Sequence, residues 1–186
     1  MKSAGEIGRI LARAGTTEKV AFFGALLVRE SGLDPDELII VGGSAIEIYT
    51  RGGIASGDLD IIGPRDRIVP TLQAWDFEPS NRRMWIRRDW GLFVDVRKDL
   101  NDYNGSRERT RFLRTPYGGI RVEGIEDAMV RRLISARHWQ VAGDFAHALA
   151  VAESAPDDID WDYAEQYAKR EMVADLLSEL RKRLPS

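Results

Sequence analysis

The chain has 186 residues, of which 44% are apolar and 31% charged, so it is long enough to bury a core and too apolar for intrinsic disorder. It contains no cysteine, which excludes disulfides, thiolate catalysis and zinc–thiolate or iron–sulfur sites. The longest apolar stretch, residues 20–28, is far shorter than the roughly 20 residues of a membrane-spanning helix, and the N-terminus lacks a secretion signal, so we expect a cytoplasmic protein with no membrane partner.

Charge is unevenly distributed along the chain. The net charge is −3, yet residues 65–121 alone carry +5 and the segments on either side are acidic. The positive charge is mostly arginine, interleaved with Trp85, Trp90 and Phe112, and this composition suits phosphates and stacking on bases. A solvated strand face has the same composition, so both interpretations stay open. The low overall charge argues against a nonspecific nucleic-acid coat.

Helical periodicity begins at the N-terminus. Ser3 and Glu6 have the spacing of a capping box, and apolar residues then recur at helical intervals. Thr16 or Thr17 can cap a second helix, which we expect to stop near Gly32. The pattern predicts two helices within residues 1–36, packed on a core that follows.

Residues 37–123 are expected to form this core. The pattern predicts, in order, a strand at 38–41, a helix from Ser44 to the glycines at 52–53, a strand at 58–62 and a helix from Pro70 to Trp75. Two strand pairs follow, one turning at residues 88–91 and one flanking residues 116–119.

Residues 124–186 show helical periodicity, interrupted at Pro156 and resumed from Trp161 to Leu184. We therefore predict an α+β protein, with a small mixed β-sheet, flanking helices and a C-terminal helical region.

Two candidate sites lie in the first half of the core. Gly42-Gly43-Ser44 stands at a strand-to-helix turn, where absent side chains let backbone N–H groups approach a phosphate, although a Gly-Gly turn can also be only a turn. Asp58 and Asp60 are two residues apart in a predicted strand, so their side chains share one face. Like charges about 4 Å apart repel by roughly 4 kcal/mol, so this pair either binds a cation or lies exposed.

Asp95 is a third candidate, because it stands between Val94 and Val96 in an otherwise apolar strand. A carboxylate there is costly to bury without a partner. It faces solvent, pairs with Arg97, or meets the earlier acids if its hairpin lies beside their strand. In the last case three carboxylates converge, and oxygen ligands of this kind suit Mg²⁺ completed by substrate phosphates.

The ordered series Gly42-Gly43-Ser44, Asp58-Leu59-Asp60 and Asp95 resembles the nucleotidyltransferase superfamily with the DNA polymerase β-like fold. The resemblance covers residues 38 to about 150. Its helical part, after Gly124 and including Asp144, is similar to the small prokaryotic members grouped with toxin–antitoxin and abortive-infection systems.

The resemblance implies transfer of a nucleoside monophosphate from a nucleoside triphosphate, with ATP as the first donor to test. It implies Asp58, Asp60 and Asp95 as catalytic and Mg²⁺-binding residues, with Asp95 either the base or a second metal ligand toward the acceptor hydroxyl. The acceptor is a protein, an RNA or a small molecule. The nucleotide-binding residues would be Gly42, Gly43, Ser44, Ser56 and Arg51.

A catalytically silent module of the same fold, an antitoxin-like protein partner or scaffold, is the alternative. The three retained carboxylates favour the enzyme. Ile54 at the position of a family arginine, and Arg131 and Arg132 where relatives often have lysine, favour the silent module. His138 and His147 lack metal-ligand spacing, and we expect structural or surface roles for them.

Overall fold

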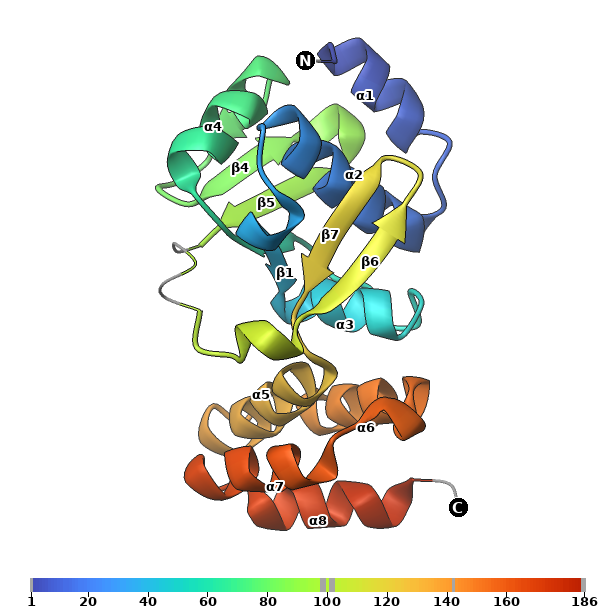
Figure 1. Cartoon of the computed structure of the whole chain (residues 1–186), viewed down its shortest axis with the longest axis vertical. Helices are drawn as coiled ribbons and strands as arrows, with labels where there is room; N and C mark the ends of the chain where they lie inside the picture. The colour runs from blue at the N-terminus through green and yellow to red at the C-terminus, as the bar shows by residue number, and fades with distance from the viewer. Residues whose placement is uncertain (1, 98–99, 101–102, 142, 185–186) are drawn as a thin grey trace. The chain divides into compact units, whose positions relative to one another are not determined.

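The structure, a computed structural model, describes residues 2–97, 100, 103–141 and 143–184 (Figure 1). The chain divides into two units, residues 1–123 and residues 124–186. All strands assigned in the described residues belong to the first unit, and the described part of the second contains four α-helices and a short 3-10 helix at Pro156–Asp158. None of the helices in the described ranges is both long and apolar enough to cross a membrane.

A seven-stranded mixed sheet forms the centre of the first unit. Its strands are β1 (Ile39–Val41), β2 (Leu59–Ile62), β3 (Glu78–Pro79), β4 (Met84–Arg87), β5 (Leu92–Val96), β6 (Arg111–Thr115) and β7 (Gly118–Val122). Their order is β3-β4-β5-β2-β1-β7-β6, with β1 parallel to β7 and β2 parallel to β5, and the other neighbours antiparallel. The mixed sheet and the helices confirm the predicted α+β class.

Four α-helices accompany the sheet: α1 (Ala4–Leu11), α2 (Thr16–Glu30), α3 (Gly42–Tyr49) and α4 (Arg65–Ala74). One face of the sheet packs on α1, α2 and α4, and alternate strand residues such as Ile40, Ile61 and Ile120 point into that core. The intervening residues point to the opposite face, where Ile39, Val41 and Ile62 pack with Tyr103 and Leu100. We call this opposite face the acidic face, because Asp60 and Asp95 lie on it.

The starts of three helices differ from the predictions, whereas that of α1 agrees. Ser3 and Glu6 form the expected capping box. The cap of α2 is Gly15 and not Thr16 or Thr17, since the Glu18 carboxylate accepts a hydrogen bond from the Gly15 N–H.

The start of α3 is at Gly42, two residues before the predicted Ser44, and that of α4 is at Arg65. Pro70 was predicted to begin α4 but lies inside it, and Pro64 takes the cap position. The proline at the start of α4 is therefore Pro64, six residues before Pro70.

The second unit consists of α5 (Ile125–His138), α6 (Asp144–Ser154), α7 (Trp161–Arg170) and α8 (Ala174–Arg183) (Figure 1). Helix α5 packs on both α6 and α7. The helical periodicity predicted from Trp161 to Leu184 corresponds to two helices and not to one, because the chain turns at residues 171–173 with Met172 in the left-handed conformation (φ 59°).

Candidate functional site

Strand pairing brings Asp60 and Asp95 side by side. Asp60 in β2 is the register partner of Asp95 in the parallel strand β5, and each residue is only 5% exposed. Asp58 directly precedes β2 and is half-buried. The part of the chain that the structure describes contains no group of three or more acidic, histidine or cysteine side chains spaced to hold a metal ion. The geometry thus gives a buried carboxylate pair with a third acid nearby.

Electrostatics couple the three acids. Burial raises the pKa of Asp60, and the negative charges of Asp58 and Asp95 raise it further, whereas the Arg97 guanidinium lowers it. The net direction of the pKa shift is upward. The ionised form of Asp60 is therefore less favourable in the folded protein than in water.

Arg97 is the cation closest to the pair. Its Nη2 lies 2.8 Å from Asp60 Oδ1 and its Nε donates a hydrogen bond of 3.0 Å to the same oxygen. The Nε also lies 3.5 Å from Asp95 Oδ2. Arg83 approaches the other oxygen of Asp95 at 3.5 Å. Pairing of Asp95 with Arg97, one of the alternatives from the sequence, is thus present, but Arg97 is bound more closely to Asp60.

Gly42 lies directly under the Asp60 carboxylate. A side chain at position 42 would place its Cβ 2.4 Å from Asp60 Oδ2, and the residue has a φ of 64° that favours glycine. The Gly42 N–H donates a hydrogen bond of 3.0 Å to Glu123 Oε2. The absent side chain thus makes room for Asp60, a reason that differs from the expected approach of a phosphate. Gly43 follows in the first turn of α3 and is half-buried.

Both predicted serines hold the backbone at the start of β2. Ser44 Oγ donates to the Asp58 carbonyl at 2.7 Å and accepts the Asp60 N–H at 3.3 Å. Ser56 Oγ donates to the same carbonyl, also at 2.7 Å. These bonds fix the segment that carries the first two acids to helix α3. Arg51 is exposed in the turn after α3, and the arginine found at the carboxylates is Arg97.

Two buried acids near the site were missed from the sequence. Glu123 is 1% exposed and follows β7, so it lies beside the end of β1 and reaches the Gly42 N–H. Glu47 is 2% exposed in α3 and accepts the Ser56 N–H at 2.7 Å. The signal that singled out Asp95, an acid between two apolar residues, is weaker at Glu123, which stands between Val122 and Gly124.

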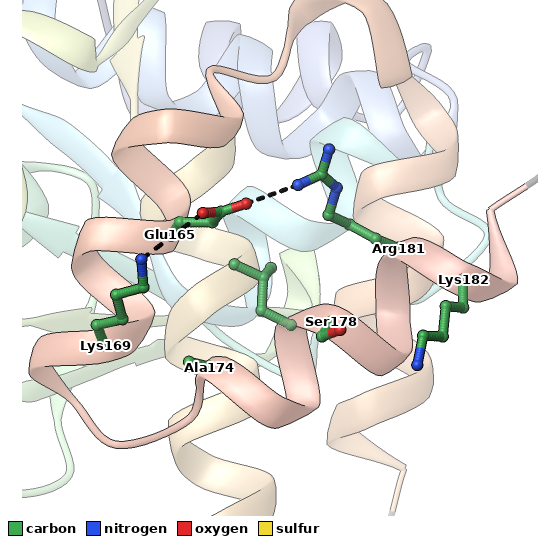
Figure 2. A pocket seen from close by; sticks show the side chains of 7 residues that line it. Glu165, Lys169, Ala174, Ser178, Arg181 and Lys182 are labelled. Atoms are coloured by element: carbon green, nitrogen blue, oxygen red, sulfur yellow. Dashed lines mark hydrogen bonds and ion pairs between the residues drawn. The ribbon is translucent and has the colours of Figure 1, made fainter.

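The second unit contains a separate groove between α7 and α8, with a volume of about 450 Å³ (Figure 2). Leu177 and Ala174 are among the apolar residues that line it, and Glu165 binds two of its cations, Lys169 at 3.8 Å and Arg181 at 2.7 Å. None of the predicted site residues lines this groove.

Asp144 opens α6 and is 2% exposed. Its Oδ1 accepts a hydrogen bond of 3.2 Å from Arg132 Nη1 and lies 3.4 Å from His147 Nδ1. The buried carboxylate therefore links α5 to the start of α6, which is a structural role.

Comparison of the chain with protein-family models, with curated proteins and with solved structures finds no match in any of the three.

Proposed function

We propose that the protein is a magnesium-dependent nucleotidyltransferase of the DNA polymerase β-like fold, which moves a nucleoside monophosphate from a nucleoside triphosphate to an acceptor hydroxyl. The observation that carries the proposal is the register pairing of Asp60 with Asp95, which holds two buried carboxylates together on one face of the sheet. Two such acids from neighbouring strands, preceded by a glycine turn, support the arrangement that the resemblance implies.

The residues present fit a divalent cation. Asp95 Oδ1 is buried and forms no hydrogen bond with the residues that the structure describes. Asp58, Asp60 and Asp95 together carry three negative charges, of which Arg97 compensates one, with the more exposed Arg83 farther away. Oxygen donors with excess negative charge are the ligands that Mg²⁺ prefers. The Asp60 and Asp95 pair would hold the ion together with substrate phosphates, with Asp58 adding negative charge nearby, and the bound ion would stabilise the charge that develops on the transferred phosphoryl group.

The residues of the site would also bind phosphate, hold the acids in position and accept a proton. Asp95 takes the proton of the acceptor hydroxyl while the bond from the acceptor oxygen to the α-phosphorus forms and the bond to the β-phosphate oxygen breaks, releasing pyrophosphate. Ser44 and Ser56 keep Asp58 and Asp60 in position through the Asp58 carbonyl. Since the Gly42 N–H is bound to Glu123, the N–H groups that bind phosphate at the start of α3 belong to Gly43 and Ser44.

The test is transfer of label from each of the four nucleoside triphosphates, with Mg²⁺, to cell-lysate components. Asp95→Asn is expected to reduce transfer by at least about 100-fold, as removal of a catalytic base does, and Asp60→Asn, which removes a metal ligand, by a similar factor. Glu78→Gln, which neutralises an exposed acid in β3, is the matched control and should transfer label at the wild-type rate. Equal transfer by Asp95→Asn and wild type would contradict the proposal.

A catalytically silent module remains the second candidate, and the Arg97 contacts favour it. One guanidinium shared by both carboxylates supplies an internal countercharge, so the pair can persist without a metal. Arg97→Gln separates the two candidates. In the absence of metal, the loss of the guanidinium should lower the free energy of unfolding by about 1–3 kcal/mol. This is less than the roughly 3–5 kcal/mol that is lost when one partner of a fully buried ion pair is removed, because the Arg97 side chain is 44% exposed.

In a metal site, Mg²⁺ should restore the stability that Arg97→Gln loses. In a silent module Mg²⁺ should leave the variant as unstable as EDTA does. Arg88→Gln, an exposed arginine in the β4–β5 turn, is the control for general loss of positive charge.

A further inference from the structure

Phe112 is an exposed aromatic ring flanked by arginines. Its exposed fraction is 45%, and it lies on β6, the edge strand of the sheet. The ring packs over Gly119 of β7, where an added Cβ would lie 2.1 Å from a ring atom. The guanidinium carbons of Arg114 and Arg121 lie 5.8 Å and 5.2 Å from the ring centroid. Glycine on one side therefore holds a flat aromatic surface between two cations.

This ring lies on the acidic face of the sheet. Phe112 is the register partner of Arg121, which pairs with Ile39 of β1, and residues directly opposite each other share a face. Val41 lies two residues after Ile39 and therefore on the same face of β1, and it pairs with Asp60. Phe112 and Asp60 thus lie on the same face of the sheet. Because β6 and β2 are three strands apart, the ring lies about 14 Å from the Asp60 strand across the sheet.

The surroundings of the ring indicate the chemistry of its ligand. The Arg121 guanidinium forms an ion pair with the exposed Asp36 at 2.7 Å and donates a hydrogen bond of 3.3 Å to the Thr110 carbonyl, while Arg114 is exposed. Phe112 is the only large apolar side chain recorded as exposed in the described part of residues 1–123. One ring among cations is too little apolar surface for a hydrophobic protein partner. A nucleobase on the ring with its phosphates on the guanidinium groups satisfies every part of the patch.

We propose that Phe112, Arg114 and Arg121 bind an unpaired nucleotide strand, and that the acceptor of the transfer reaction is a terminal hydroxyl of such a strand. The second half of this inference rests on the proposed function, whereas binding of the strand does not. RNA and DNA share the base and phosphate chemistry that the patch recognises. A few nucleotides between the stacked base and the terminus would bring the hydroxyl to Asp95.

The test measures fluorescence anisotropy of labelled single-stranded RNA and DNA of one sequence, and of the corresponding duplex, with no nucleoside triphosphate added. Wild type should bind both single strands more tightly than the duplex, and tighter binding of RNA would identify RNA as the acceptor. Phe112→Ala should weaken single-strand binding by about 5- to 150-fold, the loss expected for one stacked base. Phe112→Tyr should bind like wild type, and Met172→Ala, which removes an exposed apolar side chain elsewhere, should have no effect.

Phe112→Leu distinguishes stacking from apolar contact. Wild-type affinity in this variant would overturn the proposal, as would equally tight binding of a polyglutamate peptide, which would show that charge alone attracts the ligand. Failure of the two proposals is distinguishable. If wild type binds the strand but transfers no label, only the transferase function fails, and if it transfers label but does not bind the strand, only the nucleic-acid site fails.

Discussion

Gly42 has no side chain, and the carboxylate of Asp60 fills the space that one would occupy. Gly42→Ala would place a Cβ 2.4 Å from Asp60 Oδ2 and force a left-handed φ on alanine. We expect the free energy of unfolding to fall by at least about 1–2 kcal/mol, together with a loss of the Mg²⁺-nucleotide-dependent rise in melting temperature. Denaturant unfolding and thermal melting measure the two effects.

Gly57→Ala is the matched control, since a Cβ at position 57 meets no atom within 4 Å. Its stability should stay near that of wild type. A Gly42→Ala protein as stable as Gly57→Ala would mean that Asp60 moves freely, and the close contact would then have no role in positioning the carboxylate.

The raised pKa of Asp60 predicts how stability depends on pH in the absence of divalent cations. Its pKa is higher in the folded than in the unfolded protein, so the folded state holds this proton more tightly. The resulting stabilisation is complete below the ordinary aspartate pKa and is lost as pH rises through the raised pKa. At pH 7, Asp60→Asn should therefore be more stable than wild type, and this advantage should shrink as pH falls toward 4.

Denaturant unfolding between about pH 4 and pH 8 in EDTA measures this difference. Asp157→Asn, an exposed acid outside the site, should show no such trend. If wild type is the more stable protein at pH 7, the attraction of Arg97 exceeds the cost of burying Asp60, and the site does not need a metal to be stable.

The sequence identified Asp60 because it shares a strand face with Asp58, and Asp95 because an acid between two valines is visible in the local pattern. The two acids are adjacent because β2 pairs with β5. The sequence pattern did not determine this pairing, and it was only one of three possible positions for Asp95. Glu123 was missed for a physical reason. Its bond to the Gly42 N–H joins residues 81 positions apart, and it follows from the parallel pairing of β1 with β7, which no local pattern encodes.

For the helices and strands as well, the features that depend on residues close together in the sequence were predicted, and those that depend on residues far apart were not. The capping box of α1 and the β4–β5 hairpin depend on residues within a few positions of each other, and both were predicted correctly. The β2–β5 pairing depends on residues more than 30 positions apart, such as Asp60 and Asp95. The turn between α7 and α8 was missed because its left-handed residue is Met172 instead of a glycine or an asparagine.

That methionine gives a prediction about the α7–α8 hairpin. Met172 is 71% exposed and has a φ of 59°, a conformation that costs most side chains about 1–2 kcal/mol. Met172→Gly should raise the free energy of unfolding by about 1 kcal/mol because glycine adopts this conformation without strain. Met172→Ala keeps the strain and should show no gain. A gain of equal size in both variants would assign the effect to the exposed side chain and not to the backbone.

The protein as a whole has a negative net charge, whereas the proposed nucleic-acid patch of Phe112, Arg114 and Arg121 is positively charged. The net charge is −3, so the attraction for a nucleic acid must come from a few arginines and not from a general field. If Arg114 and Arg121 each neutralise one phosphate, the logarithm of the affinity for a single strand should fall with the logarithm of salt concentration with a slope of about −1.4. Anisotropy titrations at several salt concentrations measure it, and a slope steeper than about −4 would contradict a two-arginine patch.

The two edges of the sheet have a consequence for self-association. An outer strand exposes unpaired backbone groups to which a second copy can add, and such addition leads to aggregation. At one edge, β3 is only two residues long and includes Pro79, which lacks an N–H group. At the other edge, β6 carries Arg111 and Arg114, whose like charges would repel the same strand of a second copy. Arg114, which we assign to phosphate binding, thus also opposes the addition of a second copy at this edge. Removal of its charge should both weaken nucleic-acid binding and increase aggregation.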